Sequence, residues 1–394
     1  MFNSIAIDRP RTQLPRIIAI LYNPTIPTHL NGSLINHPPT MAALISYAHS
    51  LADKGLESLN LLEKRQVGWM TKNRKTGIYL REQQHLTKKL KLLVLFSKPV
   101  EWIDTTWAGR YYLHEKNDEQ KIKEEKAKSK EEIKGFIDYF EINMGDYEPS
   151  DPAAYDTFQA FFTRHHRPGA RPIAASDNDS VAVCVADSRV VVYDTVTQTK
   201  KLWIKGRNFS ISNLLNDPTL AEPWSNGSVA SFRLSPQDYH RYHSPVSGTV
   251  KWWKELDGEY YDVDPICLQS DIDILTANAR SAMCIDSPAF GLVLFVAIGA
   301  VDVGTVKLNP KFMTEGASVR KGDEVGIFEF GGSSIIVAFE GGRVAFDEDL
   351  REVSLEKVMM DVEPIHYPSS HLPSPSPTKA LPVLQATHKK SIYV

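Results

Sequence analysis

The sequence predicts an α+β protein in which an N-terminal helical region precedes a mostly antiparallel, β-rich domain. In parts of the first 150 residues, apolar side chains recur at intervals of three and four, as on one face of a helix. Beyond residue 150, short β-branched and aromatic runs alternate with glycine-containing turns, which is typical of antiparallel strands. With 42% hydrophobic and 24% charged residues, the composition excludes a mostly disordered chain.

Charge and cysteine content exclude several classes of protein. The net charge of −3 gives no basic excess, so we expect no nucleic-acid partner. Cys184, Cys267 and Cys284 cannot all pair, and no C-x-x-C motif is present. We therefore expect neither a disulfide framework nor a metal site, and the chain suits a reducing compartment. No apolar run reaches the 18 to 20 residues that a membrane-spanning helix needs.

The first 150 residues divide into an extension and a helical region. Residues 1–40 contain scattered Pro, Asn and Thr without a sustained period, which predicts a disordered extension. Residues 41–150 are predicted to be helical, with amphipathic stretches at 39–62 and 80–96. Lys88, Lys89 and Lys91 lie beside the apolar face of the second stretch, an arrangement that suits an anionic membrane surface. By pattern alone, a helix packed on its own domain explains this stretch slightly better.

The remaining chain is predicted to form a β-rich domain and a tail. A charged run at 115–134, with seven acids and seven lysines, indicates a solvated helix or linker before this domain. The domain covers 151–363, and its strand-like runs are 181–185, 189–193, 250–253, 292–298, 326–330 and 335–339. Residues 364–394 include six prolines and five serines, so we expect a disordered tail.

Three short segments of the β-rich domain contain residue types that support chemistry. They are the Gly331-Gly332-Ser333-Ser334 step, the segment 235–245 with His240 and His243, and the turn at Asp187. Each has an ordinary structural explanation: a tight turn, two unremarkable histidines and a turn cap. A lone His-x-x-His pair is also a poor metal site without further ligands.

Together these segments resemble the phosphatidylserine decarboxylase family, in its fungal, soluble or peripheral form. The resemblance rests on the blocks FEFGGSS, SPQDYHRYHSP and VADS. It extends through YDTFQAFFTRHHRPGAR at 155–171, WIKGRNFSISNLL at 203–215, VLFVAIGAVDVG at 293–304 and KGDEVGIFEFGGSSIIVAF at 321–339. In all it covers residues 69 to 362, which is most of the chain.

The resemblance implies that the chain cuts itself between Gly332 and Ser333. Ser333 would attack the preceding carbonyl and become a pyruvoyl group, the only cofactor implied. The family's Asp–His–Ser triad maps onto Asp187, His243 and Ser333, in which an imidazole activates a hydroxyl and a carboxylate orients the imidazole. Gly331 would allow the bent backbone and Ser334 would support the cleavage loop.

The resemblance also implies the reaction and its partners. The pyruvoyl group would form a Schiff base with phosphatidylserine, and His240 would donate a proton to give phosphatidylethanolamine. A phospholipid substrate favours membrane contact through Lys88, Lys89 and Lys91. Expected partners are a peripheral membrane surface, the two fragments of the cleaved chain and a second copy of the chain.

Two alternatives remain open at this point. Related fungal enzymes decarboxylate free aromatic amino acids such as tryptophan, and a non-catalytic membrane-binding protein could have the same fold. The presence of Asp187, His243 and Ser333 disfavours the non-catalytic alternative. We expect the protein in the cytoplasm with peripheral endomembrane association, with the mitochondrion as the other candidate.

Overall fold

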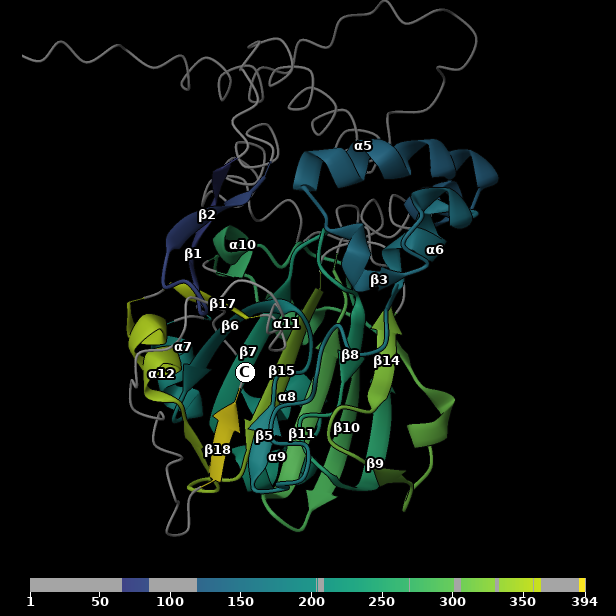
Figure 1. Ribbon diagram of the computed structural model, residues 1–394. Helices are drawn as coiled ribbons and strands as arrows, with labels where there is room; N and C mark the ends of the chain where they lie inside the picture. Colours follow the sequence, from purple (N-terminus) through teal and green to yellow (C-terminus); the bar gives the residue numbers. More distant parts are fainter. Residues whose placement is uncertain are drawn as a thin grey trace, which may run out of the picture.

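The computed structural model describes residues 66–84, 119–202, 204, 209–268, 270–300, 306–329, 333–356, 358–362 and 390–393. Over these residues, one large sheet forms the centre of the molecule, with small sheets and short helices around it (Figure 1). Most neighbouring strands of the large sheet run antiparallel. The prediction of an α+β fold with a mostly antiparallel sheet is confirmed.

The large sheet has ten strands in the order β13-β9-β10-β11-β15-β7-β6-β17-β1-β2. Their bounds are β1 Gln66–Asn73, β2 Tyr79–Gln83, β6 Ser188–Tyr193, β7 Ser228–Leu234, β9 Gly248–Leu256, β10 Arg280–Ser287, β11 Gly291–Ile298, β13 Ser318–Val319, β15 Ser333–Phe339 and β17 Met359–Val362. Only β1 and β17 pair in parallel within this sheet, among the described residues.

Three smaller sheets accompany the large one in the described part of the chain. The first has the order β12-β14-β8, the second β16-β18-β5 and the third pairs β3 with β4. The bounds are β3 Tyr147–Glu148, β4 His165–His166, β5 Val181–Val183, β8 Arg241–His243, β12 Val306–Leu308, β14 Glu324–Phe328, β16 Val344–Phe346 and β18 Lys390–Tyr393.

The helices of the described residues are mostly short. They are α5 Lys130–Phe140, α6 Phe158–Phe162, α7 Val196–Leu202, α8 Ile211–Leu215, α9 Pro218–Ala221, α10 Pro265–Leu268, α11 Ile274–Ala277 and α12 Glu348–Leu355. Single 3-10 turns occur at Ala127–Ser129, Met144–Asp146, Pro152–Ala154, Glu222–Trp224 and Pro310–Phe312. None of these helices is long and apolar enough to cross a bilayer.

The large sheet is buried on both faces, which explains its uninterrupted apolar strands. Along β15, Ile335 and Val337 point into one core and Ile336 into the other, because successive side chains of a strand alternate. The first core also contains Tyr242 of β8 and Phe328 of β14. The second core includes apolar residues of α8, α10 and α11.

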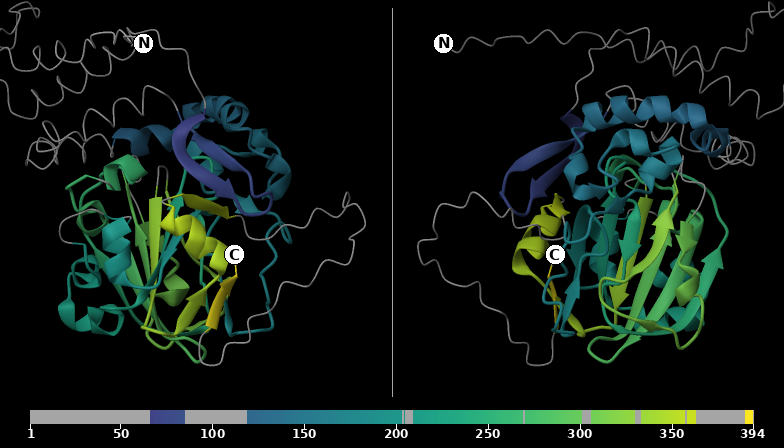
Figure 2. Two further views of the ribbon diagram at one scale, coloured as in Figure 1. Left: turned by 90° about the vertical axis from the view of Figure 1, so that its left-hand side faces the viewer. Right: turned by 45° about the vertical axis from the view of Figure 1, so that its right-hand side comes forward.

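An aromatic cluster joins α5 and α6 at one end of the large sheet. Phe158, Phe161 and Phe162 of α6 are buried against Ile133 and Phe136 of α5. Figures 1 and 2 place these helices and the β1–β2 hairpin at the same end of the molecule. The candidate residues discussed below are near this end.

Two sequence predictions differ from the structure. Residues 66–83, expected within a helical region, form the β1–β2 hairpin, whose turn is capped by Asn73 and contains Gly77 at φ +70°. Only β1 pairs with the rest of the sheet, through β17 almost 300 residues away, so local periodicity could not reveal it. Within the tail expected to be disordered, Lys390–Tyr393 form β18 between β16 and β5.

The expected amphipathic stretch at 80–96 lies largely outside the described residues, as do residues 1–65.

Candidate active site

Ser333 occupies the first position of strand β15, in the middle of the large sheet. Its backbone is opposite Leu234 of β7, and the residue is fully buried. The Oγ atom has no hydrogen-bond partner among the described residues, whereas buried hydroxyls normally have one. A buried, unsatisfied hydroxyl at the start of a strand is therefore a candidate reactive group. Gly331 and Gly332, which precede it, lie outside the described residues.

The side chain of Ser334 points to the opposite face of the sheet from that of Ser333, because successive side chains of a strand alternate. It is also buried, and its backbone is opposite Arg233 of β7 and Ile298 of β11. The strand is thus paired on both sides from its second residue onward. This pairing holds the chain immediately after the Gly332–Ser333 bond, the part of the cleavage loop that Ser334 was expected to support.

His240 is fully buried at the end of a turn that follows β7. Its Nδ1 lies 3.0 Å from the carbonyl oxygen of Asp238. Because a carbonyl only accepts, Nδ1 carries the proton and Nε2 is the basic nitrogen of the neutral ring. The ring packs on Phe162, with 3.9 Å between ring centroids.

The backbone places His240 in the same part of the fold as Ser333. The His240 carbonyl accepts a hydrogen bond from Phe328 N at 2.8 Å, and Phe328 ends strand β14 five residues before Ser333. On the other side, Leu234, the partner of Ser333, precedes His240 by six residues. The chain before His240 and the neighbouring strand β14 therefore each come within six residues of the Ser333–Leu234 pair along the sequence.

His243 ends strand β8 and has a partner at each ring nitrogen. Nδ1 lies 2.9 Å from the Gly322 carbonyl and Nε2 lies 3.2 Å from the Tyr239 hydroxyl. Nδ1 therefore donates, and Nε2 accepts from Tyr239. Burial lowers the pKa of His243, although the hydrogen bond to Gly322 and the charges of Glu324 and Asp187 oppose this. The ring is thus a neutral base at neutral pH.

Asp187 lies in the turn before β6 and is held by the side chains of Arg171 and His166. Arg171 donates through Nη2 at 2.9 Å and Nε at 3.2 Å, and His166 Nε2 lies 3.3 Å from the same carboxylate. Burial alone would raise the pKa of Asp187, but the contacts with His166 and Arg171 lower it to about 2. The carboxylate is therefore ionised throughout the physiological range.

Asp187 and His243 meet in one cavity of about 300 Å³, which His166, Arg171 and Tyr239 also line. Ser333 does not line it. Tyr242 points into the core that contains Ile335 of β15, so its neighbour His243 faces the opposite side of β8. Ser333 points into that core too, because residues two apart along a strand share a face.

The expected hydrogen-bonded chain from Asp187 through His243 to Ser333 is therefore not formed in this structure. The guanidinium fork of Arg171 occupies the carboxylate in a charge-assisted pair, and Gly322 and Tyr239 occupy the imidazole. The structure instead places Asp187 and His243 in the lining of one cavity, and it bonds the His240 backbone to Phe328 of β14, five residues before Ser333 in the sequence. The roles of the four residues stay predictions.

Sequence reasoning missed the residues that hold these groups. His166, Arg171 and Tyr239 all lie inside the blocks that carry the family resemblance, yet nothing local marks them as partners of Asp187 or His243. The contact of Arg171 with Asp187 spans 16 residues and that of Gly322 with His243 spans 79. Lys88, Lys89 and Lys91, the expected membrane contacts, lie outside the described residues.

Comparison with known proteins places this arrangement in a family. The sequence model of phosphatidylserine decarboxylase matches residues 158–360, more than half of the chain and all four candidate residues. The chain belongs to the phosphatidylserine decarboxylase family. The predicted resemblance is thereby confirmed. The β1–β2 hairpin precedes the matched range.

Relatives of this family come from plants, yeasts and bacteria. The chain is 42% identical over 236 residues to phosphatidylserine decarboxylase proenzyme 2 of Oryza sativa subsp. japonica, covering 59% of this chain and 37% of that protein. It is 40% identical over 239 residues to proenzyme 3 of Schizosaccharomyces pombe, covering 61% of this chain and 24% of that protein. For the proenzyme of Fusobacterium nucleatum, identity is 35% over 234 residues, covering 59% of this chain and 76% of that protein.

The chain thus spans well under half the length of the plant and yeast relatives and about three quarters of the bacterial one. All three relatives are named proenzymes, which indicates that they mature from a precursor.

Proposed function

We propose that the chain cleaves itself between Gly332 and Ser333 and then decarboxylates phosphatidylserine to phosphatidylethanolamine. The observation that carries this proposal is the Ser333 hydroxyl, which is fully buried and lacks a hydrogen-bond partner among the described residues. It directly follows two glycines, whose freedom of backbone angle suits a bent scissile segment. Membership of the family supports both steps.

Self-cleavage uses atoms that the chain itself provides. The Ser333 oxygen forms a bond to the Gly332 carbonyl carbon, its proton is taken by a base, and the Gly332–Ser333 amide bond breaks to leave an ester and a free amine. Removal of the Ser333 α-proton then breaks the Cβ–O bond and releases the 1–332 chain as a carboxylate. Water replaces the nitrogen of the remaining unit, ammonia leaves, and a pyruvoyl group begins the 333–394 chain.

His243 is our candidate for the base that activates Ser333. Its lowered pKa keeps the imidazole neutral, and the Gly322 carbonyl holds the proton on Nδ1 so that Nε2 accepts. Because Nε2 accepts from Tyr239 and the ring faces away from the core into which Ser333 points, activation by His243 requires that the two side chains move together and that this bond be exchanged for one to Ser333. Asp187 lines the same cavity and would stabilise the imidazolium by its charge.

The surroundings of Ser333 fit a pyruvoyl group. The unsatisfied Ser333 hydroxyl oxygen leaves with the 1–332 chain when the Cβ–O bond breaks, and the carbonyl groups of the pyruvoyl unit that remains carry no hydrogen-bond donor that burial would leave unpaired. When present, this group supplies an electron sink for the bond that breaks as carbon dioxide leaves. His240, held through Nδ1 by the Asp238 carbonyl, is our candidate for the residue that takes up a proton on Nε2 and delivers it to the former α-carbon.

A Ser333→Ala variant tests the proposal against wild type. We expect wild type to separate into chains of 1–332 and 333–394 on a denaturing gel, and the variant to stay whole. Mass spectrometry of the short wild-type chain should show a blocked, nitrogen-free first residue. Ser334→Ala is the matched control, since it removes a neighbouring buried hydroxyl but keeps the backbone pairing by which Ser334 supports the cleavage loop, and it should still cleave. A Ser333→Ala protein that cleaves at the same bond would disprove the mechanism.

The substrate is tested separately on cleaved protein. Phosphatidylserine in mixed micelles and free tryptophan are supplied side by side, and the released carbon dioxide and amine product are measured. We expect product from the phospholipid alone. Product from tryptophan alone would keep the chemistry and assign the aromatic amino acid, whereas cleaved protein with neither product would reject both substrates.

A further inference from the structure

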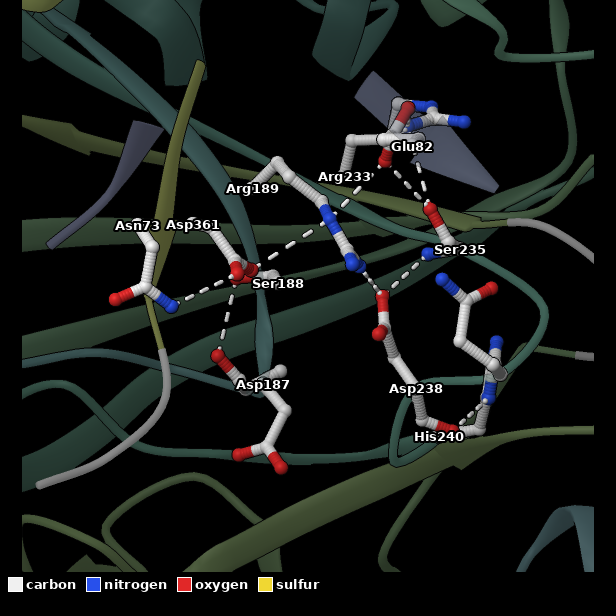
Figure 3. Close-up of polar contacts among 12 residues, drawn as sticks. Asn73, Glu82, Asp187, Ser188, Arg189, Arg233, Ser235, Asp238, His240 and Asp361 are labelled. Atoms are coloured by element: carbon white, nitrogen blue, oxygen red, sulfur yellow. Dashed lines mark hydrogen bonds and ion pairs between the residues drawn. The ribbon is translucent and has the colours of Figure 1, made fainter. Parts of the chain in front are cut away.

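Glu82 is a buried residue of the β1–β2 hairpin, which forms one edge of the large sheet and precedes the range that the family model matches. It lies on β2, and its carboxylate accepts from Arg233 Nη1 at 2.6 Å and 2.7 Å and from Ser235 Oγ at 2.8 Å. Arg189 Nε lies 3.0 Å from the same group. Figure 3 shows these side chains converging from three strands and the following turn. Burial alone would raise the pKa of Glu82, but the two arginines lower it, so the group is ionised.

The partners of Glu82 also hold the turn that carries His240. Ser235 N donates to the Asp238 carboxylate at 2.6 Å, and Arg189 forms an ion pair with that carboxylate. The Asp238 carbonyl in turn accepts from His240 Nδ1. Glu82 is therefore linked to the turn at Ser235 directly and at Asp238 through Arg189 (Figure 3).

The same residues lie beside the scissile bond. Arg233 is the backbone partner of Ser334, and the next residue, Leu234, is the partner of Ser333. Arg233 also pairs with Arg189 across β6 and β7. Of the two arginines that share Glu82, Arg233 thus lies on β7, which pairs with the start of β15, and Arg189 lies on β6, the next strand of the sheet.

Charge balance makes Glu82 hard to replace within this cluster. Arg233 is buried and the Arg189 side chain is 11% exposed. The other carboxylates near these two arginines are Asp264 at 3.9 Å, Asp361 at 3.6 Å and the paired Asp238. Without Glu82, Arg233 keeps only the more distant Asp264 as a charged partner among the described residues. A buried guanidinium that loses its close partner moves toward another acceptor or toward water.

We propose that Glu82 is a positioning residue: the β1–β2 hairpin supplies the buried carboxylate that sets the 235–240 turn, and through it His240 and the start of β15. The hairpin is then part of the machinery for cleavage and decarboxylation, although it lies outside the range that the family model matches. This inference rests on the proposed function of Ser333 and His240.

The test compares Glu82→Gln with Glu356→Gln. Glu356 accepts from Tyr79 of the same hairpin at 3.2 Å but is exposed, so its variant removes a carboxylate charge at the contact between hairpin and body without touching the buried cluster. We measure the rate of self-cleavage, the pH profile of decarboxylation by the cleaved fraction, and the melting temperature. Small displacements of catalytic groups cost about 10- to 100-fold in rate. We expect a loss of this size and an altered pH profile in Glu82→Gln, and neither in Glu356→Gln.

A purely structural role predicts a different result. Glu82→Gln would then melt earlier but cleave and decarboxylate at the wild-type rate with the wild-type pH profile, which would overturn the inference. If Glu82→Gln does not fold, the Ser235→Ala variant is used in its place, because it removes the hydroxyl that links Glu82 to the turn. Wild-type rates of cleavage and decarboxylation in Ser235→Ala would also overturn the inference.

Failure of the proposed function has a separate signature. If wild type cleaves but does not act on phosphatidylserine, the cleavage rate still tests Glu82. If wild type does not cleave, the proposed function fails first, before any Glu82 variant is compared, and the inference falls with it.

Discussion

The ion pair of Asp187 predicts a specific dependence of stability on pH. The pKa of Asp187 falls from an ordinary value of 3.8 to about 2 in the folded protein because His166 and Arg171 outweigh the effect of burial. A carboxyl whose pKa is lower in the folded state stabilises the protein above its unfolded pKa and loses this contribution as pH falls. At about 1.4 kcal/mol for each pH unit, the difference corresponds to about 2.5 kcal/mol at neutral pH.

The perturbation is Asp187→Asn in a Ser333→Ala background, which keeps a single uncleaved species. Denaturant titrations give the free energy of unfolding of both proteins between pH 7 and pH 3. We expect a gap of about 2.5 kcal/mol above pH 5 that shrinks to roughly half at pH 3, because the contribution disappears between the unfolded and folded pKa. Asn also removes contacts that do not titrate, so the pH-dependent part of the gap is the diagnostic quantity. A gap that is constant from pH 7 to pH 3 would refute the reasoning.

Three further predictions follow from the site and the core. On a denaturing gel, His243→Ala should remain whole, whereas His240→Ala should cleave yet release little carbon dioxide; the reverse pattern would transfer the base role to His240, which shares the neighbourhood of Ser333. Ile336→Ala empties a fully buried position in the centre of β15 and should lower the free energy of unfolding by about 2–5 kcal/mol, measured by denaturant titration of the Ser333→Ala protein; a loss below about 1 kcal/mol would contradict the packing. Replacement of Lys88, Lys89 and Lys91 by Glu should weaken sedimentation with anionic liposomes but not with neutral ones, and unchanged binding would reject the membrane-contact hypothesis.

Strands with strong local signals could be predicted from the sequence. The runs 189–193, 292–298 and 335–339 fall within β6, β11 and β15, because uninterrupted apolar residues suit strands that are buried on both faces. The turn at Asp187 was also apparent from the polar break between two apolar runs. These features depend on neighbours in the sequence, which is why composition and periodicity reveal them.

Features that depend on distant partners could not be predicted. The hairpin that contains Glu82 takes its place in the sheet from β17, and Glu82 reaches Arg233 across 151 residues. A glutamate in a strand with exposed neighbours on one side gives no sign of burial between two arginines. The prediction of the site was similarly incomplete. The family motifs identified four candidate residues but not their hydrogen-bond partners; the four are Asp187, His240, His243 and Ser333.

The position of β15 determines what a cut before Ser333 would do to the molecule. β15 lies between β11 and β7, and β17 lies between β6 and β1. A 333–394 peptide would therefore be interleaved with the larger piece at two separate places in one continuous ladder. Because β15 and β17, the two strands of this peptide in the large sheet, are each paired on both sides with strands of the larger piece, we expect the two products to stay together and to unfold as one unit.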